Sequence, residues 1–173
     1  MEPTILTPVG PVAHVVRART TRGPTALRLR GWPAACGRTS ADRIRAAVLN
    51  SGFSLPAGRT TLWIEPELAE ANPGTDLAAA LALMLADPSR AHVRQSNLMA
   101  WGALDLDGTL RPADKEPMAE LPDEGWVGRF WSHHDEVPRP DEAAVLTVID
   151  VPDLSRAWEV IVRLLDIQAA LLS

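Results

Sequence analysis

The sequence predicts an α+β domain with a mixed β-sheet and a central buried helix. Residues 25–30 alternate apolar and charged side chains, which is the period of a half-buried strand. Residues 77–86 are apolar on every side, which is typical of a helix enclosed by other elements. The dipeptide Asp107-Gly108 between two apolar stretches predicts a two-residue hairpin turn, and therefore antiparallel strands on either side of it.

The first half of the chain has the sequence patterns of three strands and two helices. Strands are expected at residues 12–18, 25–30 and 60–65, each rich in β-branched or apolar side chains. Ser40 is a suitable N-cap for a helix that runs to about Asn50, where Gly52 follows as a stop. The second, buried helix begins after Thr75 or Asp76 and is ended by Pro88.

The second half begins with the hairpin, formed by residues 98–106 and 109–111. Five prolines between residues 112 and 140 exclude a long helix there, although residues 126–131 form a short apolar piece. A buried strand at 145–151 and a final helix after Pro152 complete the order. With 173 residues, 46% of them hydrophobic, and no repeat or linker, the chain fits a single domain over 1–173.

Charge is distributed unevenly along the chain. Residues 1–60 carry nine arginines against two acidic residues, a net +7, whereas residues 61–173 carry eight basic and twenty acidic residues, a net −12. Cys36 is the single cysteine, so no internal disulfide can form. Neither a membrane span nor a signal peptide is recognisable, and we expect a cytoplasmic protein without a cofactor or a bound metal.

Several collinear blocks resemble the N-terminal domain of the magnesium-chelatase-like AAA+ ATPases, the group of ComM and YifB. They lie at residues 29–33, 43–53, 55–59, 64–66, 75–77 and 102–112. The resemblance implies a Lon-protease-like fold of βαβ type, and it is good over about residues 12–112. The family's AAA+ module is missing, because no phosphate-binding loop with its lysine and serine or threonine is present.

The same resemblance implies where a serine-lysine catalytic pair would lie. The serine position falls on Gly74 and the lysine position on or near Pro117, and neither residue can perform the chemistry. A shifted pair of Thr75 and Lys115 is the remaining hydrolase alternative. We therefore expect a non-catalytic binding or assembly module, with residues 113–144 as a remodelled proline-rich segment. A scaffold fragment of a longer AAA+ ATPase is a further alternative.

Two motifs suggest other chemistry. Asp105 and Asp107 stand in a D-x-D-G-T sequence, which is typical of phosphatases that use an aspartate nucleophile with Mg²⁺. Only 63 residues follow the motif, and no second acidic pair accompanies it, so the hairpin is the better interpretation. Residues 133–136 read His-His-Asp-Glu, but adjacent residues of an extended chain point to opposite sides and rarely bind one ion together.

Two sets of residues are candidates for binding. Arginines of the first sixty residues could contact phosphates of a nucleic acid, and we select Arg28, Arg30, Arg38, Arg45 and Arg59. Against this, the net charge of −5 repels polyanions, and Glu65, Glu67 or Glu70 could neutralise the strand arginines. Three aromatic residues in the least family-like segment are the candidate site for a protein partner, such as an AAA+ ATPase or a second copy: Trp126, Phe130 and Trp131.

Overall fold

The computed structural model describes residues 4–10, 12–93, 98–111, 128–131 and 148–171. A seven-stranded sheet has the order β3-β4-β2-β1-β5-β8-β9, and β6 and β7 form a separate hairpin. The strands are β1 (Thr4–Val9), β2 (Val12–Thr21), β3 (Ala26–Arg30), β4 (Arg59–Glu65), β5 (Leu98–Trp101), β6 (Ala103–Leu104), β7 (Leu110–Arg111), β8 (Gly128–Trp131) and β9 (Val148–Asp150). The helices are α1 (Ala34–Asn50), α2 (Asp76–Leu85) and α3 (Leu154–Leu171), with short 3₁₀ helices η1 (Pro73–Thr75) and η2 (Pro88–Val93).

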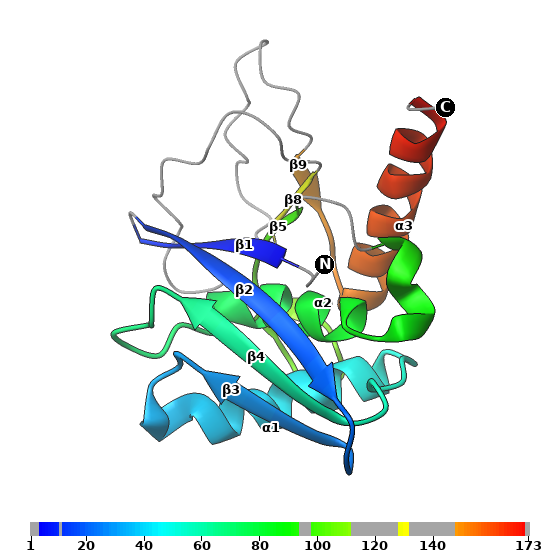
Figure 1. Cartoon of the computed structure of the whole chain (residues 1–173). Coiled ribbons are helices and arrows are strands. Elements are labelled where there is room, and N and C mark those ends of the chain that lie inside the picture. The colour runs from blue at the N-terminus through cyan, green and yellow to red at the C-terminus, as the bar shows by residue number, and fades with distance from the viewer. Residues whose placement is uncertain (1–3, 11, 94–97, 112–127, 132–147, 172–173) are drawn as a thin grey trace.

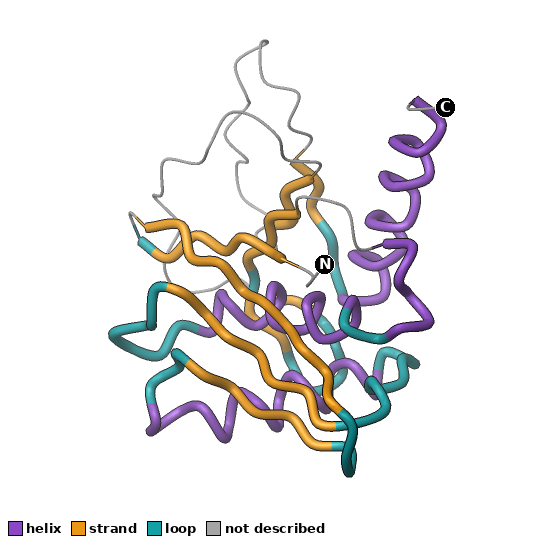
Figure 2. The backbone as a smooth tube through the Cα atoms, in the orientation of Figure 1, coloured by secondary structure: helices purple, strands orange, loops and turns teal. Residues whose placement is uncertain are grey.

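The sheet is mixed, as predicted. Strand β2 runs antiparallel to both β1 and β4, whereas β1 with β5, β3 with β4, β5 with β8, and β8 with β9 are parallel. Figure 1 shows α1 and α2 together behind β2, β4 and β3, and Figure 2 shows the same two layers in the backbone trace. No helix of the described residues lies over the opposite face of these three strands in these views. The domain is therefore α+β, with one sheet face covered by helices.

Helix α2 is the centre of the core. Every residue from Asp76 to Leu85 is buried, and the helix packs against α1 and against strands β1, β2, β4 and β5. Such a position requires apolar side chains all round, because no side of the helix faces water. The prediction of a buried central helix is confirmed.

Helix α1 begins earlier than the sequence predicted. Pro33 occupies the N-cap position, with φ −55° and ψ 136°, and its carbonyl accepts hydrogen bonds from the amides of Cys36 and Gly37 at 3.0 and 2.9 Å. Proline suits the start of a helix because its φ is already fixed near the helical value and because the N–H group that it lacks would have no partner within the helix there. Ser40, expected as the cap, lies buried inside the helix instead.

The hairpin forms at Asp107-Gly108, but its strands are shorter than expected. Gly102 divides the predicted strand 98–106: its amide donates to the Gly74 carbonyl at 2.7 Å, and its carbonyl accepts from the Leu77 amide at 3.0 Å. Residues before Gly102 belong to β5 in the main sheet, and residues after it form the hairpin. Gly108 has φ +90°, which glycine adopts without strain.

Two tryptophans lie in contrasting environments. Trp32 is buried, with 9% of its surface exposed. Trp63 is only half-buried, because it points to the face of β4 opposite to the helices. Among the described residues, no helix is both long enough and apolar enough to cross a membrane.

Candidate functional site

The position at which the resemblance implies a nucleophile is filled by an aromatic ring. Gly74 is buried in η1, held by a hydrogen bond of 2.9 Å from its amide to Asn72 Oδ1. A Cβ at this residue would collide with the Trp101 indole nitrogen and would lie 2.6 Å from Trp101 Cε2. Glycine is therefore required here as long as Trp101 occupies the space.

Thr75, the shifted nucleophile candidate, is fully buried and its hydroxyl is engaged. Thr75 Oγ1 donates to the Asn72 carbonyl at 2.9 Å and accepts from Trp32 Nε1 at 3.3 Å. Both bonds hold the segment that leads into α2. The two candidates for the amine side of the pair, Lys115 and Pro117, lie outside the described residues.

Asp76 follows as a buried carboxylate at the start of α2. Its Oδ2 accepts a 2.7 Å hydrogen bond from Nε of Arg43 on α1, and only 1% of its side chain is exposed. Burial raises the pKa of Asp76 to about 6, although the hydrogen bond and charge of Arg43 oppose that rise. The pair ties α1 to α2 at the point where the resemblance places the catalytic segment.

The two aspartates of the phosphatase-like motif form an ion pair and hydrogen bonds within the hairpin. Asp105 Oδ2 pairs with Arg111 Nε at 2.6 Å, across the two strands. Asp107 accepts hydrogen bonds from the Thr109 hydroxyl at 2.6 Å and the Thr109 amide at 2.9 Å, and these bonds lower the pKa of its carboxyl. No group of three or more metal-ligand side chains occurs in the described part of the chain, and residues 133–136 lie outside it.

Five arginines gather on the open face of β2, β4 and β3. The strand register places Arg30 and Arg17 on either side of Trp63, and Arg28 and Arg19 on either side of Thr61. Arg59 extends the same face of β4 by alternation. We call Arg17, Arg19, Arg28, Arg30, Arg59 and Trp63 the arginine face.

The arginine face has a hollow beside β2 and β4. Arg17, Arg19, Trp63 and Glu65 line this depression of about 210 Å³, so Trp63 borders open space next to two arginines and one glutamate. Strand arginines that flank an aromatic ring combine charge with a stacking surface. The geometry is that of a platform, because the three strands that carry it run side by side.

Acidic residues of the described part of the chain do not pair with every arginine of the arginine face. Glu65 pairs with Arg17 at 3.3 Å, and both side chains remain largely exposed, at 62% and 46%. Within the described residues, Arg28 and Arg30 form no ion pair, so the expected neutralisation by Glu65, Glu67 or Glu70 does not occur at those two side chains. The local charge is positive although the chain as a whole is negative.

The structure thus divides the five arginines that the sequence singled out. Arg28, Arg30 and Arg59 share the arginine face, whereas Arg38 and Arg45 lie on α1, in the layer behind the sheet. Arg17, Arg19 and Trp63 were missing from that selection. The alternation of arginines at 17 and 19 and at 28 and 30 could have indicated one face, but only the register between strands shows that both pairs point the same way.

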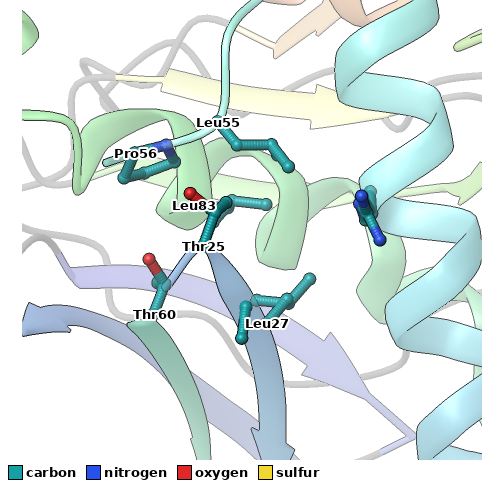
Figure 3. A pocket seen from close by; sticks show the side chains of 8 residues that line it. Thr25, Leu27, Leu55, Pro56, Thr60 and Leu83 are labelled. Carbon is teal, nitrogen blue, oxygen red and sulfur yellow. The ribbon is translucent and has the colours of Figure 1, made fainter. Parts of the chain in front are cut away.

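Arg38 and Arg45 line two separate cavities beside β3. Arg38 belongs to an open groove of about 480 Å³ that also contains Arg28, Arg30 and Asp42. Arg45 borders a small pocket of about 20 Å³, which Figure 3 shows between Thr25, Leu27, Thr60 and Leu83. That pocket has room for about one water molecule and is too small for an organic ligand.

The predicted partner site is only partly within the described residues. Trp126 lies outside them, and Phe130 and Trp131 belong to β8, which pairs with β5 and β9 inside the sheet. The proline-rich segment at 113–144 likewise lies mostly outside the described residues. Both remain predictions.

Known proteins similar to this chain point to one group. A family model described as subunit ChlI of Mg-chelatase matches residues 16–120. The uncharacterized protein Rv2897c of Mycobacterium tuberculosis is 38% identical over 98 residues, which cover 56% of this chain and 20% of that protein. YifB of Salmonella typhimurium is 32% identical over 100 residues (56% and 19%), and YifB of Escherichia coli 30% over 97 (56% and 19%). The matched part of the chain spans about a fifth of the length of these relatives.

Proposed function

Because the chain belongs to the family described as subunit ChlI of Mg-chelatase, we propose that it is a non-catalytic binding module of a larger machine. Membership confirms the resemblance that the sequence motifs indicated. The relatives are about five times longer than the matched part, so we place the module beside an AAA+ partner that supplies the motor. Its own task is to hold single-stranded nucleic acid on the arginine face.

The absence of catalysis is supported by the segment around Gly74. A nucleophile needs a side chain with a free hydroxyl or thiol next to a base. Residue 74 has no side chain and no space for one beside Trp101, and the hydroxyl of Thr75 is enclosed between Asn72 and Trp32. The residues of this segment pack against other residues and form hydrogen bonds within the core.

Binding of a polyanion is supported by the arginine face, which is the observation that carries the proposal. Proteins that bind single strands without sequence preference combine a positively charged track with aromatic rings on which bases stack. Trp63 provides such a ring, and Arg17 and Arg30 flank it on the neighbouring strands. Guanidinium groups suit phosphates because their planar fork can donate two hydrogen bonds to one phosphate.

The overall charge of −5 weakens the long-range attraction of a polyanion but does not change the local positive charge of the arginine face. Charges separated by more than about 10 Å are largely screened at 0.1 M salt, so a bound strand responds mainly to the arginines that it touches. Three to five phosphate contacts give a slope of log affinity against log salt of about −2 to −3.5. A single strand fits better than a duplex, because Trp63 can stack only on unpaired bases.

Fluorescence anisotropy with a labelled twelve-nucleotide single strand tests the proposal. Trp63→Ala should weaken binding about tenfold, because base stacking on an aromatic side chain contributes about 1–3 kcal/mol, whereas Trp63→Phe should retain most of the affinity. Arg30→Ala should weaken binding and make the salt slope shallower. Arg45→Ala, on the opposite side of the sheet, is the matched control and should bind as the wild type does.

Two outcomes would contradict this function. One is a wild-type protein that does not bind the oligonucleotide even at low ionic strength. The other is binding that Trp63→Ala and Arg30→Ala leave unchanged, which would place the nucleic acid elsewhere on the chain.

A further inference from the structure

A second surface lies along the outer edge of β3, and it shares Arg28 and Arg30 with the arginine face. Among the strands of the described residues, β3 lies at the end of the sheet and pairs with β4 alone. The amide of Ala26 donates towards β4, to the Gly58 carbonyl at 3.3 Å. Because successive residues of a strand direct their N–H and C=O groups to opposite sides, Leu27 and Leu29 present theirs to the outer edge.

The groove of about 480 Å³ runs along this edge. One wall is β3 from Leu27 to Arg30, and the other is the first half of α1. The residues of α1 that line it lie at helical spacing on one face, and three of them have small side chains: Ala34, Gly37 and Ala41. A Cβ built on Gly37 has no atom within 4 Å, which shows that the space in front of α1 is open.

The groove combines an apolar floor with positive walls. Leu27, Leu29 and Trp32 supply the apolar surface. Arg28, Arg30 and Arg38 line the same space, together with the carboxylate of Asp42. The arrangement fits a ligand that carries alternating apolar and negative groups.

We propose that an extended acidic peptide of a partner protein binds along β3 as an additional strand of the sheet. Such a peptide would satisfy the outward N–H and C=O groups of Leu27 and Leu29 with its own backbone. Its acidic side chains would lie beside Arg28 and Arg30 on one face of the sheet, and its apolar side chains would pack on the floor of the groove on the other. Arg38, which lines the groove from α1, adds positive charge there. Affinity comes from the main-chain bonds and selectivity from the charges.

A second copy of this chain fits the edge less well. Pairing β3 with β3 of another copy would bring Arg28 and Arg30 of each molecule against those of the other. Like charges on adjacent strands are destabilising. The edge is therefore protected against self-association and selective for an acidic strand.

Binding of a labelled heptapeptide of alternating valine and glutamate, followed by fluorescence anisotropy, tests the proposal. The wild type should bind this peptide and should bind the valine-lysine version at least tenfold more weakly. Arg38→Glu should weaken binding of the acidic peptide at least tenfold. Arg45→Glu, two turns further along α1 and outside the groove, is the matched control and should have little effect.

Backbone methylation separates strand addition from simple charge attraction. N-methyl groups on one alternate set of peptide amides should abolish binding, while methyl groups on the other set should not, because only one set faces β3. If both methylated peptides bind like the parent, or if Arg38→Glu has no effect, the proposal is wrong. Light scattering tests the alternative occupant. If the wild type is a dimer and Arg38→Glu is a monomer, the edge of β3 binds a second copy of the chain and not an acidic peptide, and the proposal is wrong.

Two variants can separate peptide binding from oligonucleotide binding, because Trp63 does not line the groove and Arg38 does not belong to the arginine face. Trp63→Ala should reduce oligonucleotide binding and leave the peptide bound. Arg38→Glu should do the reverse. Both variants change side chains outside the core, and thermal unfolding should verify that they are folded.

Discussion

The indole of Trp101 lies where a side chain on residue 74 would have to be: a Cβ built on Gly74 would be 2.6 Å from Trp101 Cε2. Trp101 is 2% exposed at the end of β5, so the ring is held by the sheet and cannot easily move away. The contact joins the start of α2 to the main sheet through a glycine and a ring.

Gly74→Ser should therefore destabilise the protein and create no hydrolase. Overpacking of a filled core costs about 1–3 kcal/mol. Urea denaturation of the variant and the wild type measures the difference in free energy of unfolding. Trp101→Ala alone should cost about 3–5 kcal/mol, because it leaves a cavity. Gly74→Ser in the Trp101→Ala background should cost less than in the wild type, and equal costs in both backgrounds would exclude the steric explanation.

Asp76 should give the protein a distinctive pH dependence. Its pKa is about 6 in the folded state against 3.8 as the ordinary value, so between about pH 4 and 6 the folded state holds a proton that the unfolded state releases. The contribution of Asp76 to stability is greatest below about pH 4 and is lost as the pH rises through 6, a change on the order of 2–3 kcal/mol. Urea denaturation from pH 4 to 7 should show this loss in the wild type.

The Asp76→Asn variant is the control for that loss. Asparagine keeps an acceptor for Arg43 but does not titrate, so the difference in stability between the two proteins should change with pH in favour of the variant as the pH rises. Asp107 acts in the opposite direction, because its lowered pKa gives stability that disappears as the pH falls. A stability difference that stays constant over the whole range would contradict the assignment to Asp76.

Removal of Arg43 should also be costly. Arg43→Met keeps an unbranched side chain but leaves the carboxylate of Asp76 without its 2.7 Å partner. Loss of one member of a buried pair costs about 3–5 kcal/mol, and the 25% exposure of Arg43 places the expected cost somewhat below that. The double variant Arg43→Met with Asp76→Asn should recover part of the lost stability. No recovery would mean that the two residues act independently.

Asp105→Asn separates the hairpin role from the phosphatase alternative. The pair with Arg111 is exposed at 37% and 60%, so we expect a change of less than about 1 kcal/mol in the free energy of unfolding. Phosphate release from a generic aryl phosphate with Mg²⁺ should stay at background for wild type and variant alike. Turnover by the wild type that Asp105→Asn abolishes would instead support the phosphatase.

The sequence predicted those elements that local patterns determine. The buried helix α2 and the turn at Asp107-Gly108 follow from side chains within a few positions of one another. Strand β1 was missed because its two neighbours, β2 and β5, come from distant parts of the chain and its own residues include a proline and two threonines. Pairing with these distant strands stabilises β1, whereas its own local pattern does not indicate a strand.

The candidate site was predictable in part for a similar reason. The excess of arginines in the first sixty residues was visible, and it drew attention to Arg28 and Arg30, which lie on the arginine face. Which arginines share a face depends on the register of three strands, which no local pattern gives. The space around Gly74 likewise depends on Trp101, a residue that η1 meets only through the fold.

The position of β1 also has a consequence for how the protein acquires its structure. Ile5 pairs with Leu98, so closing the sheet requires a residue near one end to find a partner that lies beyond α1, β4 and α2 in the chain. Contacts between such distant residues carry a large loop-closure entropy and slow folding. On the ribosome, the β2–β4–β3 portion can assemble before β5 emerges, whereas β1 must wait with one side unpaired.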